Sequence, residues 1–411
     1  MLTKAKGLFK DQLKEKSTWG FMAFAIILII CRYVSMFYIP DIYNDVILDE
    51  SRIVDHITSI ITNGTDTYGA KWPLYSHVGD GYVTYAFLYP MALLCAIFGS
   101  GVMNARAIIQ TLTIISCILT ASGVKIWTNN KRLFWYTLII ALSIPWGFVQ
   151  GNRIWDPTFV PLYFSIVFYF WCRLLKTDYS TKLRLLYEVL VYGGLVFVAV
   201  IYPPNRIPAV AMWIFLLIWG LKENKVYKKD VIFIVVVSAI FSLPLAYYLF
   251  FDDEFNSRAA LYLVFQGESL KEEIVTYFKN LFDLFSPTYL FITGDQIDRH
   301  SLPRWGLLGT INVVAAIVLI RKKYDKMDKF LLYTIFWTFA STALTNEYQP
   351  HTLRACLVWM PASILLAEAW DIFLKDRSKK KKAFWYICFI GFFIVYFGSF
   401  IRYYGYLCTI R

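Results

Sequence analysis

Charged residues are scarce in this chain of 411 residues: Asp, Glu, Lys and Arg make up 17% of it, against 58% hydrophobic residues and a mean hydropathy of +0.51. Soluble domains carry about 25% charged residues, so the composition excludes an ordinary soluble enzyme. The seven Cys show no zinc-site or disulfide spacing. The first apolar block lacks a small-residue cleavage site, so we expect a retained membrane span instead of a signal peptide.

Long apolar blocks separated by short basic loops are what the sequence has in abundance, and this pattern is typical of a multi-span membrane protein. Twelve segments are candidate spans: 19–38, 82–99, 104–127, 133–150, 158–175, 185–202, 207–221, 231–251, 304–320, 330–346, 355–374 and 383–401. Segment 82–99 contains Pro90 and several Tyr, which favours an interfacial or re-entrant helix.

The distribution of Lys and Arg indicates whether segment 82–99 crosses, because cytoplasmic loops of membrane proteins are enriched in both. Five Lys precede the first span, which favours a cytoplasmic amino terminus. If 82–99 does not cross, twenty further Lys and Arg join them on the inner side. These twenty lie in the loops 128–132, 176–184, 222–229, 321–329 and 375–382. The net charge of +12 then reports membrane orientation and does not indicate nucleic-acid binding.

We therefore predict an all-α, multi-pass protein of the cell membrane with about eleven transmembrane helices. Its amino terminus is expected inside and its carboxyl terminus outside. Residues 1–401 would form the membrane domain, and residues 402–411 a short external tail. The two long external loops would be 39–103 and 252–303, and loops of such length usually carry function.

Each long external loop contains a predicted amphipathic helix that would lie on the outer membrane surface. In the first loop, apolar residues recur at helical spacing over 50–62, and Asn63-Gly64 is a stop signal. In the second, Ser269 and Glu272 form a capping-box pattern before a helix with one apolar face.

Acidic residues cluster directly after the first span, as Asp41, Asp45, Asp49 and Glu50. A carboxylate here could remove a proton from an acceptor hydroxyl as a general base. Neighbouring residues on a helix point about 100° apart, so only one of the last two can face a given substrate atom. Asp49 is the candidate base and Glu50 its support. In the alternative interpretation, Asp49 is the N-cap of the helix 50–62.

Arg and His residues stand at several turns on the same predicted outer side. They are Arg153 in the turn that also holds Asp156, Arg206 in Tyr202-Pro203-Pro204-Asn205-Arg206, the pair Arg299-His300, and His351 with Arg354. Several convergent cations suit a phosphate because their hydrogen bonds are charge-assisted. The alternatives are that Arg153 and Asp156 pair with each other or cap a helix, and that Arg206 snorkels to the headgroups.

The sequence leaves a metal site undecided. Asp55-His56 and Asp298-Arg299-His300 combine residue types that bind Zn²⁺ or Mg²⁺. Neither shows the i, i+4 or CxxC spacing of a strong metal motif. No cofactor is therefore assigned with certainty, and a divalent metal stays an open alternative.

Seven short motifs follow one another along residues 15–375. They are Asp49-Glu50, Gly64-Thr65-Asp66-Thr67-Tyr68-Gly69 with Pro73, Phe98-Gly99 with Arg106, Arg153 with Asp156-Pro157, Tyr202 with Arg206, Gly294-Asp295 with Arg299-His300, and Pro350-His351 with Arg354. In this order the chain resembles the GT-C glycosyltransferases that use polyprenyl-phosphate sugars, in particular the protein O-mannosyltransferases and the bacterial aminoarabinose transferases.

The resemblance implies a membrane enzyme that transfers a sugar from a polyprenyl-phosphate donor to a glycan, lipid or protein acceptor on the external face, with inversion. Asp49 would be the base, supported by Glu50, and Asp156 would position the acceptor or sugar. The departing lipid phosphate would be held by Arg106, Arg153, Tyr202, Arg206, Arg299, His300, His351 and Arg354. Besides membrane lipids, a partner subunit is expected as one source of the acceptor-binding domain that many members carry after the last span.

Two departures from the family pattern and two rival functions remain. One departure is that no soluble domain is expected after the last span, and the other lies before the helix 82–99. Where many members have His-Pro-Pro or Lys-Pro before the helix 82–99, this chain has His77-Val78-Gly79-Asp80-Gly81. The rivals are a transporter or flippase of lipid-linked sugars, and an external polysaccharide polymerase or ligase that uses a diphosphate donor. A transporter would carry charges deep within its spans, and Arg32 is the main candidate for such a charge.

Overall fold

The computed structural model describes residues 16–39, 46–79, 81–176, 179–252, 255, 261–267, 269–295, 297 and 299–409. Outside this part lie Asp41, Asp45, Asp298 and the last residues of the predicted tail.

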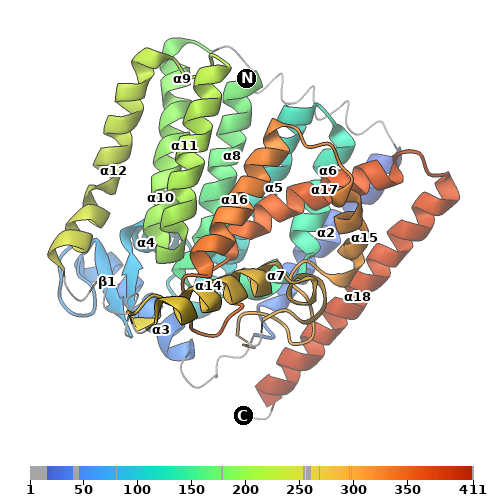
Figure 1. The fold of residues 1–411 in the computed structure, drawn as a ribbon. Coiled ribbons are helices and arrows are strands. Elements are labelled where there is room, and N and C mark those ends of the chain that lie inside the picture. Colours follow the sequence, from blue (N-terminus) through green and yellow to red (C-terminus); the bar gives the residue numbers. More distant parts are fainter. Residues whose placement is uncertain are drawn as a thin grey trace.

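The described elements form a bundle of helices with one small hairpin at its edge (Figure 1). The α-helices are α2 (Lys16–Ser35), α3 (Val46–Asn63), α4 (Tyr85–Phe98), α5 (Val102–Thr128), α6 (Lys131–Ser143), α7 (Pro145–Gln150), α8 (Val160–Lys176), α9 (Thr181–Glu188), α10 (Gly194–Ile201), α11 (Arg206–Lys222), α12 (Val231–Phe251), α14 (Leu270–Phe285), α15 (Val313–Ile320), α16 (Lys326–Thr342), α17 (Trp359–Lys375) and α18 (Lys379–Thr409).

Eight helices in the described part are long and apolar enough to cross a membrane, so the chain is a multi-pass membrane protein. They are Thr18–Ser35, Val102–Thr128, Asp156–Lys176, Thr181–Ile201, Pro203–Lys222, Lys228–Phe251, Cys356–Lys375 and Lys379–Cys408. The predicted count of eleven is not confirmed. Three predicted spans, 133–150, 304–320 and 330–346, contain helices of fewer than 18 residues.

The predicted span 133–150 is broken in the middle, and Arg32 occupies the break. Ile144 has extended backbone angles, and Pro145 starts the short helix α7. The carbonyls freed at the end of α6 would be costly to bury without donors. Arg32, itself fully buried, donates to the carbonyl oxygens of Leu142 (2.9 Å), Gly147 (2.9 Å) and Ala141 (3.3 Å). The deep charge expected of a transporter therefore has a structural role here.

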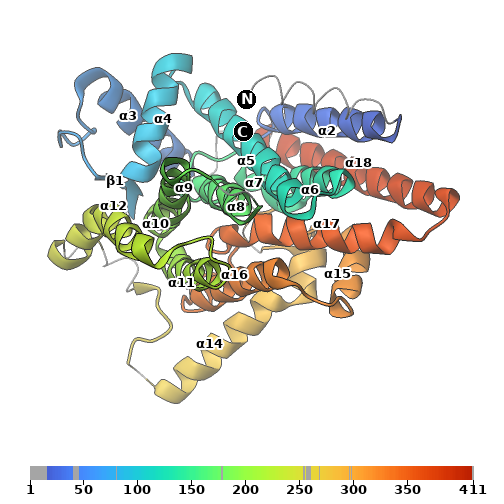
Figure 2. The same cartoon turned by 90° about the horizontal axis from the view of Figure 1, so that it is seen from above.

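Helices α2 and α18, the first and last in the described part of the chain, run in parallel, side by side (Figure 2). Near their starts, the rings of Phe21 and Tyr386 lie 5.8 Å apart, and near their ends Cys408 lies 3.4 Å from the carbonyl oxygen of Tyr38. The start of α2 and the end of α18 consequently lie at opposite ends of the bundle. The parallel arrangement agrees with the odd number of crossings predicted from the charges.

Helix α4 begins and ends at one face of the bundle. Its 14 residues span about 21 Å at 1.5 Å per residue, less than the roughly 30 Å of a bilayer core. Thr84, just before α4, lines a cavity at that face, and Arg106, in the first turns of the following helix α5, pairs with Glu50 of α3 there. This placement is that of a helix which does not cross, as the charge distribution predicted for 82–99.

A two-stranded antiparallel sheet, β1 (Tyr75–Val78) paired with β2 (Gly81–Thr84), is the one departure from the predicted all-α architecture within the described residues. Gly79 in its turn has φ +58°, a left-handed conformation that glycine adopts without steric cost. The hairpin matters because both strands contribute to the wall of the cavity described below.

The two predicted amphipathic helices exist as α3 and α14, but their surroundings differ. In α3 the apolar residues Ile53, Ile57 and Ile60 are buried within the protein, so this face is not available to a membrane surface as predicted. In α14, which extends outward from the bundle, Leu270 and Phe282 are both more than 60% exposed, as a membrane-facing helix requires. The predicted capping bond of Ser269 is absent; instead, Glu273 accepts hydrogen bonds from the backbone of Gln266 and Gly267.

Candidate active site

A cavity of about 640 Å³ lies at the face where α3, the hairpin and the start of α11 meet. We call it the site cavity. Its charged and titratable lining consists of Asp49, Asp156, Arg206, Arg299, His300, Glu347, His351 and Arg354, together with the phenols of Tyr75, Tyr82, Tyr202 and Tyr262. These side chains come from segments far apart in the sequence, and the fold alone brings them together.

Asp49 and Glu50 point in different directions, as their neighbouring positions on a helix require. Asp49 lines the site cavity beneath the hairpin turn, where its carboxylate lies 3.6 Å from the place that a β-carbon on Gly79 would occupy. Asp49 is the fourth residue of α3, so the alternative that it is the N-cap of this helix is wrong. The Asp49 side chain therefore lines the cavity instead of capping the helix.

Glu50 turns away from the cavity into the protein. It forms a buried ion pair with Arg106, at 2.5 Å, and its other oxygen accepts a hydrogen bond from the backbone of Ile154, at 2.8 Å. Arg106 also donates to the carbonyl oxygen of Ile39. The pair thus ties α3 to α5 and to the turn that carries Asp156, and neither partner lines the site cavity.

Arg153 is also buried behind the cavity wall. It is 1% exposed, and its Nε has no hydrogen-bond partner in the part of the chain that the structure describes. Its guanidinium lies 5.8 Å from the ring of Trp155, which itself lines the cavity. Arg153 therefore contacts a residue of the cavity lining but is not itself part of that lining.

Three ionisable side chains face the cavity without an ion pair to any described residue. Asp156 supplies a carboxyl group, half-buried at the start of the helical segment that continues into α8. Arg206 supplies a positive charge at the start of α11; its Nε has no hydrogen-bond partner among the described residues, and its guanidinium lies 5.5 Å from the ring of Phe255. Arg299 supplies a second positive charge. Unpaired charges facing a cavity are typical of ligand sites, because burying them is costly unless a partner binds.

Arg354 differs from these two arginines because it is already paired within the protein. It forms an ion pair with Glu347 and donates to the hydroxyl of Thr345 at 2.8 Å. Burial raises the pKa of the Tyr202 phenol to about 12, and the nearby charge of Arg354 lowers this pKa by less than burial raises it. Tyr202 is therefore a hydrogen-bond donor at neutral pH.

His300 and His351 stack at the cavity wall, with ring centroids 4.5 Å apart. Burial, reinforced by the nearby charges of Arg299 and Arg354, lowers the pKa of both imidazoles, that of His351 well below its usual value. For His300, the carboxylate of Asp295 acts in the opposite direction without cancelling this effect. Both histidines are thus neutral at pH 7 and face the cavity as hydrogen-bond groups, not as cations.

Asp295, His300 and His351 are the three described side chains that could hold a metal, since one ligand atom from each lies within 4.8 Å of the others. The Nδ1 of His300 lies 3.3 Å from the carboxylate of Asp295 and has no hydrogen bond in the described part. A carboxylate and two imidazoles are a donor set that Zn²⁺ accepts. The Asp295 oxygens already accept bonds from the backbone of Ile297 and Thr352, which fixes the carboxylate in place.

Of the residues predicted from the sequence, the fold brings Asp49, Asp156, Tyr202, Arg206, Arg299, His300, His351 and Arg354 to one cavity. It places Glu50, Arg106 and Arg153 behind the wall. Sequence reasoning missed Glu347 and the hairpin. The acid four residues before His351 was a weak signal for the first, and Gly79-Asp80-Gly81 between alternating residues was a signal for the second.

Comparison with known proteins identifies the fold. No protein-family model matches the chain, and no curated protein matches it. Among solved structures, ArnT from Cupriavidus metallidurans bound to undecaprenyl phosphate superposes with a TM-score of 0.59 and 13% identity, over 91% of this chain and 63% of that one. The apo oligosaccharyltransferase of Archaeoglobus fulgidus superposes with a TM-score of 0.57 and 12% identity, over 95% and 56%.

These similarities define the architecture of the bundle. The two solved proteins are membrane glycosyltransferases with the GT-C fold, and the chain has this fold, as the resemblance of its motifs implied. It spans about three fifths of the length of either protein.

Proposed function

We propose that this chain is an integral membrane glycosyltransferase that moves a sugar from a polyprenyl-phosphate donor to an acceptor hydroxyl at the external face. The observation that carries the proposal is the site cavity: it combines a candidate base, Asp49, with Asp156 and two arginines that lack ion-pair partners in the described chain. The fold shared with ArnT, a protein that binds undecaprenyl phosphate, supports the donor class.

The reaction would be a single displacement. The Asp49 carboxylate removes the proton of the acceptor hydroxyl as its oxygen forms a bond to the anomeric carbon. The bond between that carbon and the phosphate oxygen breaks, and its electron pair leaves on the phosphate. Attack opposite the leaving group inverts the anomeric centre. Asp156 would orient the acceptor or sugar through its carboxylate oxygens.

Arg206 and Arg299 would stabilise the charge that develops on the departing phosphate, with Tyr202 and the neutral histidines donating hydrogen bonds. Preorganised cations at a developing negative charge are among the largest contributions to catalysis. Arg354, which is held by Glu347, would complete the wall with less freedom to move.

Glu50, Arg106 and Arg153 would act as positioning residues. Glu50 accepts a hydrogen bond from the backbone of Ile154, two residues before Asp156, and so links the orientation of α3 to that of the Asp156 turn. Because Asp49 and Glu50 are adjacent, the buried pair with Arg106 also fixes the direction in which Asp49 points.

The donor class can be tested with the purified chain in proteoliposomes. Radiolabelled sugars of several kinds would be supplied on a polyprenyl monophosphate, on a polyprenyl diphosphate and on a nucleotide. We expect transfer to an added acceptor from the monophosphate alone, with inversion seen by NMR of the product. Transfer only from the diphosphate would instead indicate a polymerase or ligase, and movement of the donor across the vesicle without transfer would indicate a flippase.

A further inference from the structure

A second cavity, of about 930 Å³, lies at the opposite end of the bundle, among α2, α6, α17 and α18. We call it the basic-end cavity. Helix α5 shows the separation of the two cavities, because Arg106 near its start pairs with Glu50 behind the wall of the site cavity, whereas Asn129, directly after its end, lines the basic-end cavity. Nothing in the proposed transfer reaction uses this second cavity. Its volume falls in the usual range of ligand pockets, about 300–1,000 Å³.

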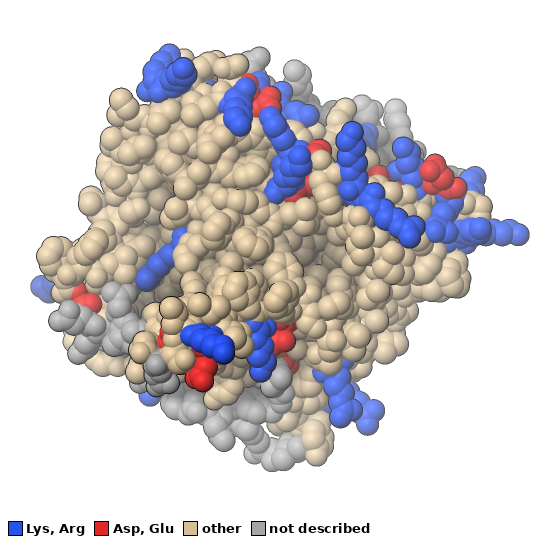
Figure 3. Space-filling model, in the orientation of Figure 1, with Lys and Arg blue, Asp and Glu red and all other residues tan. Residues whose placement is uncertain are grey.

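The charged lining of the basic-end cavity is entirely positive. Lys131, Arg132, Lys379 and Lys382 line it, and no described acidic residue does. Arg132 pairs with Asp371 just outside the lining, whereas Lys131 and Lys379 have no ion pair with a described residue. Figure 3 shows the same excess around this end of the surface, where Lys and Arg outnumber Asp and Glu along the upper edge. Lys382 donates to the carbonyl oxygen of Lys375, and none of the three lysines pairs with a carboxylate of the described residues.

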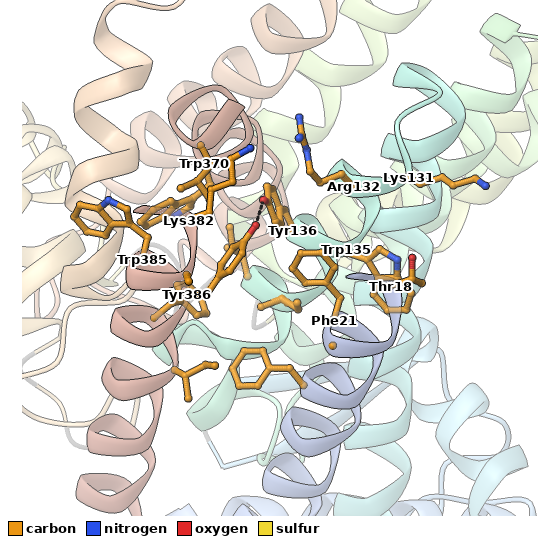
Figure 4. Close-up of a pocket in the computed structure, with 18 of the residues that line it drawn as sticks. Thr18, Phe21, Lys131, Arg132, Trp135, Tyr136, Trp370, Lys382, Trp385 and Tyr386 are labelled. Carbon is orange, nitrogen blue, oxygen red and sulfur yellow. Dashed lines mark hydrogen bonds between the residues drawn. The ribbon is translucent and has the colours of Figure 1, made fainter. Parts of the chain in front are cut away.

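Below this rim the wall is aromatic. The Phe21 ring packs edge to face against Tyr136 and Tyr386, with centroids 5.6 and 5.8 Å apart, and the hydroxyls of the two tyrosines share a hydrogen bond of 2.7 Å. Trp135 and Trp385 complete the wall. Figure 4 shows Lys131 and Arg132 at the upper rim, above the rings of Phe21 and Tyr386. An apolar chamber under a cationic rim matches a molecule with one anionic end and an apolar tail.

We propose that the basic-end cavity binds an anionic phospholipid, with the phosphate at the lysines and an acyl chain against the aromatic wall. Basic pockets between transmembrane helices on the cytoplasmic side are suited to anionic headgroups, and the loops here are those that the charge distribution predicts to be cytoplasmic. A soluble anion would gain nothing from the aromatic wall, whereas a zwitterionic lipid would bring an ammonium group toward the cationic rim. The occupant is thus a lipid whose headgroup carries net negative charge.

Two variants test the two halves of this site separately. Lys131→Gln/Lys379→Gln/Lys382→Gln removes the rim charges, and Gly20→Phe fills the chamber without changing charge. Gly20 lines the cavity in α2, and a β-carbon on it would meet no heavy atom within 4 Å, so a side chain can start there without a clash. The matched control is Lys228→Gln/Lys229→Gln, two exposed lysines in another loop of the basic end that do not line the cavity.

The experiment is native mass spectrometry of the full chain in detergent with equimolar phosphatidylglycerol and phosphatidylcholine. We expect one phosphatidylglycerol to remain bound to the wild type and to the control, with retention at least about tenfold lower in the charge variant. Gly20→Phe should also lose it, while thermal unfolding shows that each variant is folded. Equal retention of the two lipids by the wild type, equal loss in the control, or full retention by Gly20→Phe would each overturn the proposal.

Discussion

The two cavities of this bundle differ in the sign of the charges that line them. The site cavity contains three acids and three arginines beside two neutral histidines, whereas the basic-end cavity contains only lysines and an arginine above aromatic rings. Group transfer needs both signs, a base for the incoming hydroxyl and cations for the departing phosphate. Retention of an anionic lipid needs only positive charges. Under the two proposals, the contrast separates the cavity proposed for group transfer from the cavity proposed for lipid binding.

Substitution of Asp49, the proposed base of the site cavity, should cause the largest loss of transfer activity. Asp49→Asn keeps the size of the side chain but removes its basicity, so we expect transfer from a polyprenyl-phosphate sugar to fall about 10²–10⁴-fold. The measurement is the rate of product formation in proteoliposomes. Asp55→Asn, on the exposed side of the same helix, is the control and should retain its rate. An Asp49→Asn enzyme that worked at the wild-type rate would show that the base lies elsewhere.

Loss of an unpaired cation should have the next largest effect. Arg206→Gln removes one of the two arginines that face the site cavity without an ion pair in the described chain, and kcat/KM for the donor should fall about 10²-fold. Lys222→Gln, at the other end of the same helix α11, provides the control because it is far from the site cavity. If both substitutions lowered kcat/KM equally, the sidedness of the phosphate site would be wrong.

The buried pair behind the wall should respond through stability. Arg106→Gln leaves the Glu50 carboxylate buried without its cation, which destabilises proteins by about 3–5 kcal/mol. Thermal unfolding in detergent would report this as a clearly lower Tm. An unchanged Tm with a large loss of donor binding would instead mean that Arg106 contacts the lipid phosphate directly.

Acid sensitivity should be the smallest of these effects. His300 and His351 have pKa values below that of a free imidazole, so between those values and about 6.5 the unfolded chain binds more protons than the folded one. Stability is therefore complete above about pH 6.5 and decreases as the pH falls below it. Tm measured from pH 7.5 to 5 should drop, and His351→Gln should flatten the curve. A steeper curve in this variant would contradict the assignment of a neutral His351.

Much of the candidate site could be predicted because its residues lie at turns that the distribution of Lys and Arg assigns to one side of the bundle. Asp49, Asp156 and Arg206 each follow or precede an apolar segment, and the helix geometry already separated Asp49 from Glu50. The bundle's general architecture followed from the apolar blocks. Pro145 gave a local signal for the break in the fourth segment.

Other features depend on contacts between distant segments, which spacing does not reveal. That Arg32 would serve the carbonyls near Pro145 required knowing that α2 packs against α6. The pairing of Glu347 with Arg354 and the burial of Arg153 depend on how loops fold over one another. The neutral state of the histidines depends on their depth, and no sequence pattern reports the depth of a side chain in a loop.

The most direct test of the account is to map where the donor phosphate binds. A polyprenyl-phosphate analogue with a photoreactive group next to the phosphate would be crosslinked to the full chain, and the sites competed by excess polyprenyl-phosphate sugar would be identified by mass spectrometry. We predict competed labelling at the start of α11 and in the segments around Arg299 and His351. Competed labelling confined to α2, α6 and α18, around the basic-end cavity, would contradict the account.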